Sequence, residues 1–590
     1  MCGIVGFVRS GAAAPEVLKL LKKLEYRGYD SAGIATIDGD KLWIKKGVGK
    51  LDEVQKMYHI DELPGKVGIG HVRWATHGGV TVANSHPHSD CKHKIAVAHN
   101  GIIENYQALR SRLGDKHTFT SETDTEVVPH LIEEYMEKGD SLEEAVIKTV
   151  KQIDGSYAML VIATAEPGKI VAVRKNSPLV IGTTENGNFV ASDALCFLDQ
   201  TQNVAFLEDG EGAVITENSI SFFDSEGQPK EKGFTNVDWQ WDEVNKLGYE
   251  HYMIKEIYEE PQAIRQALVQ DKNMIRGIAM DILRSRQVIL TACGSSRYAA
   301  LVGRYLFSKM AGKLCEVVLG SEFGYFSDSI DKNTLVIAIS QSGETADVIQ
   351  GVKEAKKRGA TILSLVNTQG SSLARISDKV LYLNCGPEIA VAATKSFASQ
   401  LTLFYMLSFA MVNLLDEVIK TLESISTRIE GILKYNGKEL PKLAEQTKNS
   451  SDFYFIARGI NYAIANEGAL KLKEVSYIHA EGMSAGELKH GTLSLIKEGT
   501  PVVAICPHDY TFTETLSNIY EAKARGAFII GVSDSPNLLF DFWVGIIDVD
   551  EIFYPLVAVV PLQLLAYHLA IARGLDPDQP RNLAKSVTVK

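Results

Sequence analysis

The first residues of the chain carry a possible nucleophile. The sequence begins Met-Cys-Gly-Ile-Val-Gly, and we expect Met1 to be removed because the second residue is small. Cys2 would then hold both a thiol and a free α-amine, which titrates near pH ~8 and is a suitable base for the thiol at neutral pH. The apolar run from Ile4 to Val8 predicts a buried strand that fixes this nucleophile. The alternative is a first strand with an incidental cysteine.

Three further segments carry residues suited to binding an amino acid. Arg73 could hold a carboxylate through two parallel hydrogen bonds, and Asp124 could hold an ammonium group. Asn100 and the backbone amide of Gly101 would form an oxyanion hole beside Cys2. An amino acid with an acyl side chain fits this set, and glutamine is the obvious member. The residues come from the segments His71–Gly78, His99–Gly101 and Ser121–Asp124.

A run of hydroxyl residues in the second half of the chain indicates a phosphate site. The predicted strand Leu335–Ile339 leads into Ser340-Gln-Ser-Gly-Glu-Thr345, and a helix with an apolar stripe follows. Three hydroxyls and the amides of a helix N-terminus can surround a phosphate without a lysine. An ordinary capped turn is the alternative, but it would use one hydroxyl. The loop Cys293–Ser296, which also follows a strand, is expected to add a second wall.

Candidates for proton transfer and amine chemistry lie nearer the C-terminus. Glu474 follows Lys471 by three residues, so both lie on one helical face, where the cation could tune the carboxylate as a base. A surface salt bridge is the simpler interpretation of this spacing. His490 could be an acid/base group or part of a turn before Gly491. Lys585 lies in a rather apolar tail and could attack a carbonyl, unless it faces solvent.

Composition limits the class of protein. With 590 residues, 45% of them apolar and 23% charged, the chain is expected to be globular and multidomain. A net charge of -12 argues against nucleic acid or an anionic membrane as a main partner. The seven cysteines are far apart and show no zinc-ligand spacing, so we expect reduced thiols in the cytoplasm and no metal.

The start of the chain lacks a basic leader and a cleavage site, so no signal peptide is expected. The most apolar later stretch, Phe553 to Ala572, contains two prolines, a glutamine and a histidine. These residues favour a core helix over a membrane span.

The chain changes character between Thr235 and Pro261. Before this segment it reads as strand-rich, and after it strands alternate with helices, as in a parallel sheet with crossover helices. The second half also repeats itself, since Thr334-Leu-Val-Ile-Ala-Ile recurs as Thr500-Pro-Val-Val-Ala-Ile. We therefore expect two copies of one α/β unit, near 280–420 and 445–575. In the second copy Cys506-Pro-His-Asp replaces the hydroxyl run, which predicts one phosphate site per chain.

Together these residues resemble the N-terminal-nucleophile glutamine amidotransferases, and the duplicated half resembles a pair of sugar isomerase (SIS) units. The resemblance implies an α+β N-terminal-nucleophile hydrolase domain of sandwiched sheets at 1–239. Two α/β SIS subdomains with parallel sheets would follow at 240–430 and 431–590. It further implies an enzyme that takes ammonia from glutamine and passes it to fructose 6-phosphate, giving glucosamine 6-phosphate and glutamate. This would be the first step of hexosamine synthesis, with no metal or organic cofactor.

The resemblance also assigns roles to residues. Cys2 would form a γ-glutamyl thioester, and Trp74 would close over the site and gate an ammonia channel. Lys585 would form a Schiff base with the sugar ketone, His490 would assist ring opening, and Glu474 would move a proton between C1 and C2. The implied substrate-binding residues are Arg73, Trp74, Thr76, His77 and Asp124 for glutamine, and Ser296, Ser340, Gln341, Ser342, Thr345 and Lys471 for the sugar phosphate.

Two other functions are compatible with parts of the sequence. A sugar-phosphate sensor would need the hydroxyl loop but not the set of Glu474, His490 and Lys585. A different glutamine amidotransferase, such as one acting on a phosphoribosyl diphosphate, would need a diphosphate-binding loop that the duplicated half lacks. The resemblance also implies a homodimer formed through the SIS half.

Overall fold

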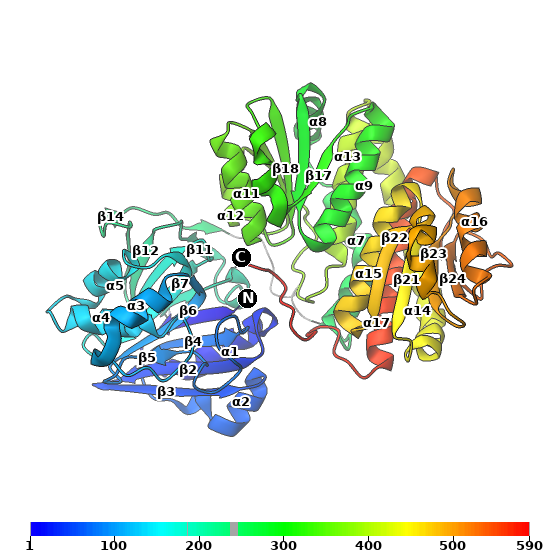
Figure 1. The fold of residues 1–590 in the computed structure, drawn as a ribbon. Coiled ribbons are helices and arrows are strands. Elements are labelled where there is room, and N and C mark those ends of the chain that lie inside the picture. Colours follow the sequence, from blue (N-terminus) through cyan, green and yellow to red (C-terminus); the bar gives the residue numbers. More distant parts are fainter. Residues whose placement is uncertain (1, 186, 237–245, 589–590) are drawn as a thin grey trace. The chain divides into compact units, whose positions relative to one another are not determined.

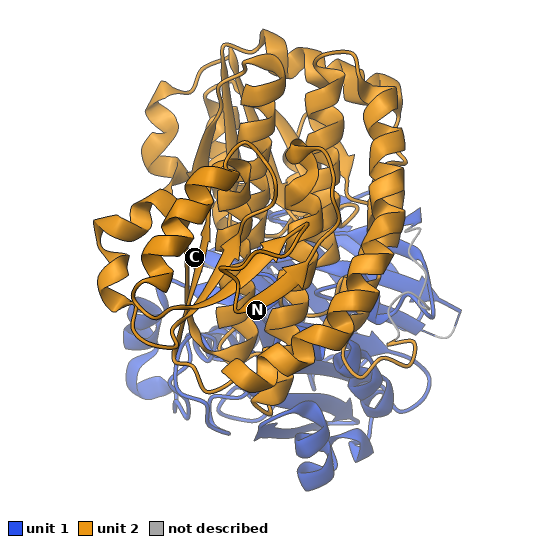
Figure 2. Ribbon diagram, turned by 90° about the vertical axis from the view of Figure 1, so that its right-hand side faces the viewer, with its two compact units in different colours: residues 1–243, 584–590 blue, residues 244–583 orange. Residues whose placement is uncertain are grey.

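The computed structural model describes residues 2–185, 187–236 and 246–588, and the chain divides into two compact units (Figures 1 and 2). Unit 1 comprises Met1–Glu243 with Ala584–Lys590, and unit 2 comprises Val244–Leu583. The expected domain boundary after residue 239 lies outside the described residues.

Unit 1 contains two antiparallel sheets that pack face to face. Side chains from both sheets, among them Ile4, Ile69, Ala98 and Leu160, form a single buried cluster between them. The other faces carry helices, since Val97 and Met159 pack with residues of α4 (Val127–Met136) such as Leu131 in a separate core. Neighbouring residues of one strand therefore serve different cores, as the period of two of a β-strand requires. This arrangement confirms the predicted sandwich of sheets.

The eight-stranded sheet of unit 1 runs in the order β15-β11-β9-β10-β1-β4-β2-β3, and the seven-stranded sheet in the order β14-β13-β12-β8-β7-β6-β5. The strands of the first are β15 (Thr235–Asn236), β11 (Asn203–Phe206), β9 (Val180–Thr184), β10 (Gly187–Ala191), β1 (Gly3–Val8), β4 (Val67–Arg73), β2 (Ser31–Asp38) and β3 (Lys41–Val48). Those of the second are β14 (Pro229–Lys230), β13 (Ile220–Phe223), β12 (Gly212–Thr216), β8 (Lys169–Lys175), β7 (Gly155–Ala163), β6 (Ile95–Ile103) and β5 (His88–Ser89). The α-helices of unit 1 are α1 (Ala14–Leu24), α2 (Leu51–Tyr58), α3 (Tyr106–Leu113), α4 (Val127–Met136) and α5 (Leu142–Val150).

Unit 2 contains two five-stranded parallel sheets of the same design. Their orders are β17-β16-β18-β19-β20 and β22-β21-β23-β24-β25, so the central strand and the direction of winding recur in the second copy. The predicted duplication is thus confirmed. The strands are β16 (Gln287–Ala292), β17 (Glu316–Leu319), β18 (Thr334–Ser340), β19 (Thr361–Val366), β20 (Lys379–Tyr382), β21 (Asp452–Ala457), β22 (His479–Ser484), β23 (Pro501–Ile505), β24 (Phe528–Ser533) and β25 (Phe542–Gly545).

Helices cover both faces of each sheet in unit 2, as parallel strands require because they are apolar on both sides. One large core joins the two copies and is built from both sheets and the helices between them. The outer faces have their own smaller cores. The larger helices are α6 (Tyr252–Tyr258), α7 (Glu260–Ala267), α8 (Lys272–Arg284), α9 (Gly294–Ala311), α11 (Ala346–Lys357), α13 (Lys395–Ala410), α14 (Leu415–Thr447), α15 (Tyr462–Ser476), α16 (Phe512–Lys523) and α17 (Tyr554–Ala572).

The apolar stretch near the C-terminus forms α17, which contacts α14 and α15 in the shared core. Among the described residues, Glu551–Ala572 is the one helical segment with the length and hydropathy of a membrane span, and 83% of its apolar window is buried inside the protein. The structure therefore places this segment in the core of unit 2, as its proline, glutamine and histidine residues predict.

Candidate functional site

The candidate nucleophile lies where the first strand meets its neighbour. β1 pairs with β4 so that Gly3 is opposite Val72, and this register brings Cys2 beside Trp74. The backbone N–H of Trp74 donates to the Cys2 Sγ at 3.3 Å, and the thiol lies 3.4 Å from the Trp74 carbonyl oxygen. Burial raises the pKa of the Cys2 thiol, although the hydrogen bond from Trp74 lowers it. The thiol therefore needs a base, which a free α-amine on Cys2 would supply.

Asn100 and Gly101 lie on β6, in the other sheet of unit 1. The side-chain amide of Asn100 donates to the Cys2 carbonyl oxygen at 2.9 Å, so Asn100 is next to the nucleophile, as the sequence predicts. Gly101 has a φ of 134°, and a Cβ there would lie 2.0 Å from the Ser156 carbonyl oxygen. A glycine is required at this position for both reasons.

Arg73 is buried at the end of β4, where its guanidinium organises the following loop. Its Nη2 donates to the carbonyl oxygens of His77 and Gly78 at 2.6 and 3.2 Å, and its Nη1 donates to Gly79 at 3.1 Å. In this structure the loop carbonyls therefore accept hydrogen bonds from the Arg73 guanidinium, which the sequence analysis expects to bind a substrate carboxylate. The neighbouring Thr76 is exposed, and the His77 ring packs edge-on against Tyr106.

Asp124 is held in a buried, ordered turn. Its carboxylate accepts a hydrogen bond from the backbone N–H of Ile103 at 2.7 Å, and its charge interacts with that of Arg73. Glu126 holds the start of this turn. Its carboxylate accepts hydrogen bonds from the backbone N–H and the hydroxyl group of both Thr120 and Ser121. That the buried Asp124 carboxylate binds an ammonium group, as the sequence analysis expects, is part of the function proposed below.

The hydroxyl loop of unit 2, Ser340–Thr345, joins β18 to α11. The Ser340 and Thr345 hydroxyls lie 2.9 Å apart, and the Ser340 Oγ accepts from the Gly343 N–H at 3.1 Å. The Ser342 Oγ accepts from the N–H of Glu344 at 3.2 Å. All three hydroxyls thus lie at the N-terminal end of α11, where the backbone dipole favours an anion. Gln341 is half-buried in the same loop.

The first turn of α9 adjoins both the hydroxyl loop's sheet and helix α15. The Ser296 Oγ accepts a hydrogen bond from the Gln400 side chain at 2.9 Å, and the Ser295 side chain influences the pKa of Glu467 on α15. The loop Cys293–Ser296, which the sequence analysis expects to be a second wall of the phosphate site, therefore lies between the strand ends of the first copy and α15 of the second.

Lys471 is buried on α15 between two carboxylates. Its Nζ lies 2.5 Å from the Glu474 Oε2 and 3.6 Å from the Glu467 Oε1. Lys471 is only 1% exposed, so the alternative of a surface salt bridge is wrong. Burial raises the pKa of Glu467 to about 8, although the charge of Lys471 lowers it.

Sequence reasoning missed Glu467. The signal was present, because Glu467, Lys471 and Glu474 follow the i, i+4, i+7 spacing of one helical face.

His490 and Lys585 are the two remaining candidates. His490 is exposed at the end of the short helix Ala485–His490, and in the described residues no hydrogen bond or ion pair joins it to Glu474. Lys585 is half-buried and lies in the C-terminal segment that belongs to unit 1.

The corresponding loop of the second copy carries negative charge. The Asp534 carboxylate accepts from the His508 backbone N–H at 2.9 Å, and Asp509 accepts from the Asn461 side chain at 2.9 Å. An anion in this loop would meet two carboxylates, which agrees with the prediction of a single phosphate site per chain.

Comparisons with known proteins define the class of this one. A glutamine amidotransferase domain model matches residues 72–199, and an SIS domain model matches residues 281–410 and 448–573. The protein is thus a glutamine amidotransferase domain joined to two SIS domains. The chain belongs to the glutamine–fructose-6-phosphate aminotransferase (isomerizing) family. It is 48% identical to the members from Thermococcus kodakarensis and Methanothermobacter thermautotrophicus, over 100% of both chains in each case.

Solved structures match the second half. The C-terminal domain of glucosamine-fructose-6-phosphate aminotransferase from Francisella tularensis is 34% identical, with a TM-score of 0.54, and covers 57% of this chain and 99% of its own. A putative phosphosugar isomerase from Silicibacter pomeroyi is 25% identical, with a TM-score of 0.51, and covers 56% and 100%.

Proposed function

We propose that this protein hydrolyses glutamine in unit 1 and transfers the ammonia to fructose 6-phosphate in unit 2, giving glucosamine 6-phosphate and glutamate. The observation that carries this proposal is that one chain, similar over its whole length to the named family, holds both halves of the chemistry. Unit 1 offers a half-buried thiol beside an amide donor, and unit 2 offers a hydroxyl loop and a buried lysine between carboxylates.

In the proposed glutaminase step, the Cys2 Sγ attacks the side-chain carbonyl carbon of glutamine, and its proton passes to the α-amine. The side-chain amide of Asn100 and the N–H of Gly101 stabilise the oxyanion that forms. The C–N bond then breaks, and the departing nitrogen takes the proton and leaves as ammonia. Water hydrolyses the resulting thioester to glutamate. Arg73, Thr76, His77 and Asp124 would hold the amino-acid end, and Trp74 would close over it.

In the proposed sugar step, Ser296, the Ser340–Thr345 loop and Lys471 hold the phosphosugar. His490 assists opening of the ring, and the Lys585 amine forms an imine at C2, releasing water. Ammonia replaces the lysine at C2, and Glu474 carries a proton from C1 to C2, which leaves an aldehyde at C1 and an amine at C2. Lys471 lies 2.5 Å from Glu474 and would hold its carboxylate in place for this step.

Ammonia must reach C2 unprotonated to act as a nucleophile, so hydrolysis and transfer belong in one protein that excludes water. The test is incubation of the purified protein with fructose 6-phosphate and amide-labelled glutamine, followed by mass spectrometry. We expect labelled hexosamine 6-phosphate. Glutamate formed without labelled hexosamine 6-phosphate would overturn the proposed acceptor and leave only the glutaminase.

We also propose a homodimer formed through unit 2 and a cytoplasmic location. All seven cysteines are free, which supports a reducing compartment. Sedimentation at micromolar concentration tests the dimer, and a monomer would overturn it.

A further inference from the structure

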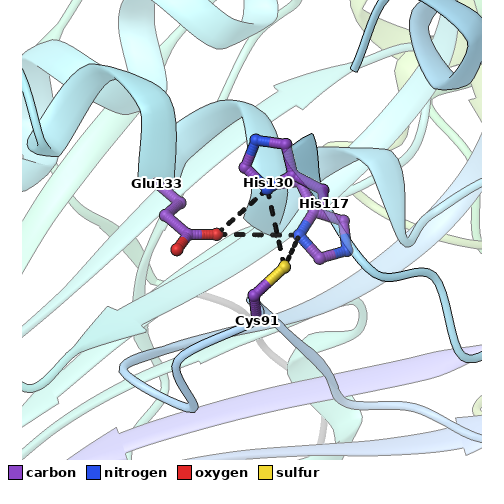
Figure 3. A group of neighbouring side chains, drawn as sticks. All are labelled: Cys91, His117, His130 and Glu133. Atoms are coloured by element: carbon purple, nitrogen blue, oxygen red, sulfur yellow. Dashed lines mark hydrogen bonds and ion pairs between the residues drawn. The ribbon is translucent and has the colours of Figure 1, made fainter. Parts of the chain in front are cut away.

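Four side chains of unit 1 converge on one point away from the candidate glutaminase site (Figure 3). Cys91 lies in the loop between β5 and β6, and His117 follows the short helix Gly114–Lys116. His130 and Glu133 lie one turn apart on α4. His117, His130 and Glu133 have side chains no more than 7% exposed, whereas Cys91 is exposed. The cluster is therefore sealed on the α4 side and can be reached from the Cys91 side.

Four of the six separations between the ligand atoms are close to those around one tetrahedral ion. The Cys91 Sγ lies 3.6 Å from the His117 Nδ1 and 3.5 Å from the His130 Nδ1. The Glu133 Oε2 lies 3.2 Å from the His117 Nδ1 and 3.7 Å from the His130 Nδ1. Tetrahedral zinc with ordinary Zn–S, Zn–N and Zn–O bonds separates neighbouring ligand atoms by about 3.3–3.6 Å. All four candidate ligand atoms lie within 4.8 Å of one another.

The groups around the cluster orient it as a metal site requires. The His117 Nε2, which points away from the cluster, lies 3.8 Å from the Glu134 carboxylate, which is on the side where a metal-binding histidine usually has an acidic partner. The backbone N–H of Thr118 donates to the Cys91 Sγ at 3.2 Å, which fixes the position of the sulfur. Phe119 packs edge-on against the His130 ring, with centroids 4.7 Å apart.

Within the cluster, the side chains contact one another through Cys–His hydrogen bonds and histidine–carboxylate ion pairs. The Glu133 Oε2, which faces both histidines, is buried and makes no hydrogen bond among the described residues. The other Glu133 oxygen is 3.6 Å from the ammonium group of Lys92. When bound to a metal, the cysteine is a thiolate, so the four ligands together would bring two negative charges that a divalent cation neutralises.

We propose that Cys91, His117, His130 and Glu133 bind a divalent cation of the zinc type. One sulfur, two nitrogens and one oxygen suit a borderline cation such as Zn²⁺, whereas Mg²⁺ and Ca²⁺ require mostly oxygen ligands. Four protein ligands close a tetrahedral site, so the ion has a structural role. It links the β5–β6 loop to both ends of the segment 117–130, which includes the turn that holds Asp124.

The test is the metal content of the full chain purified without metal-affinity chromatography. We expect one zinc per chain, removable by a chelator and restored by Zn²⁺ with submicromolar affinity. Replacement by Co²⁺ should give the visible spectrum of a tetrahedral site together with a thiolate-to-cobalt charge-transfer band. The Cys91→Ser variant should lose that band, and His117→Asn should lose stoichiometric zinc.

Two controls make the result specific to this cluster. His93 lies in the same loop as Cys91, but its ring bonds to the Ser89 hydroxyl at 3.0 Å, so His93→Asn should keep the metal. The Cys2→Ala variant should also keep it, which excludes zinc bound at the half-buried Cys2 thiol. Wild-type protein that takes up no Zn²⁺ or Co²⁺ would overturn the proposal. So would an unchanged thiolate band in Cys91→Ser, and neither result depends on the activity of the enzyme.

Discussion

The side-chain amide of Asn100 donates a hydrogen bond to the carbonyl oxygen of Cys2, 2.9 Å away. Cys2 precedes β1 of one sheet and Asn100 lies on β6 of the other, so this bond crosses the interface between the two sheets of unit 1. It fixes the proposed oxyanion donor relative to the proposed nucleophile before substrate binds. Such preorganisation is the main source of oxyanion stabilisation.

Replacing Asn100 with alanine should therefore lower kcat for glutamine hydrolysis by about 10²–10³-fold, with a smaller change in KM. Steady-state glutaminase assays measure this. The control is Asn105→Ala, since the Asn105 side chain bonds instead to the Gln152 carbonyl oxygen at 2.8 Å. An unchanged kcat in folded Asn100→Ala would remove Asn100 from the oxyanion hole.

Removing the thiol should separate the two activities. In Cys2→Ala we expect glutamine use to be abolished and isomerisation of fructose 6-phosphate to remain, because the sugar chemistry is proposed to lie in unit 2. Glutamate release and aldose formation are measured side by side. Cys315→Ala, which removes a buried thiol of unit 2, should retain both activities. Loss of both in a folded Cys2→Ala variant would contradict this modular scheme.

The Ser342 hydroxyl should contribute to sugar-phosphate affinity. Loss of one hydrogen bond to a charged phosphate costs about 1.5–3 kcal/mol, so Ser342→Ala should raise KM for fructose 6-phosphate about tenfold or more. Glutaminase activity in the absence of the sugar should not change. Ser377→Ala is a suitable control, because the Ser377 hydroxyl bonds to the Leu373 carbonyl oxygen at 2.7 Å. An equal KM in Ser342→Ala and wild type would show that the loop does not bind the phosphate.

Glu474→Gln should stop isomerisation while glutamine hydrolysis continues. The amide keeps the shape of the side chain but cannot accept the proton from C1. Exchange of the C1 hydrogen of the sugar with labelled water measures the step directly. Glu481→Gln, at an exposed position of β22, serves as the matched control. Wild-type exchange in Glu474→Gln would assign the base to another residue, and Glu467 on the other side of Lys471 would be the next to examine.

Unit 1 should lose stability in acid because of its buried histidines. Burial lowers the pKa of His71 to about 3, and the pKa of His86, which stacks on it, is lowered in the same direction by burial. Histidines in the unfolded chain titrate near pH ~6.5, so below that pH the unfolded state binds more protons than the folded state. The free energy of unfolding therefore falls as the pH falls from ~6.5 toward ~3, by about 2 kcal/mol for His71 at about pH 5.

Calorimetry between about pH 7.5 and pH 5 measures this loss. The Tm of His71→Gln should depend less on pH than that of wild type over this range. His59→Gln removes an exposed histidine and should retain the wild-type pH dependence. A His71→Gln variant with the wild-type pH dependence would show that other groups cause the acid instability.

Much of the fold could be predicted because its signals are local. The apolar run after Cys2 became β1, and the recurring strand and helix motifs became two sheets of identical order. Of the candidate residues, Cys2, Trp74 and Asn100 are brought together, and Lys471 meets Glu474 on the predicted helical face. The spacing could not show that this face is buried, because the α15 face is covered by elements from elsewhere in the chain.

The sequence by itself determined the class of fold, the duplication of the second half and the types of chemistry available, because periodicity and side-chain type are properties of short segments. Only the tertiary structure decided which groups meet. In the folded protein the Arg73 guanidinium donates hydrogen bonds to loop carbonyls, and Glu467 is buried beside Lys471. The tertiary structure also brought Cys91 within reach of His117 and His130. Their separation along the chain carries no zinc signature, since packing of a loop against α4, rather than sequence spacing, brings their side chains together.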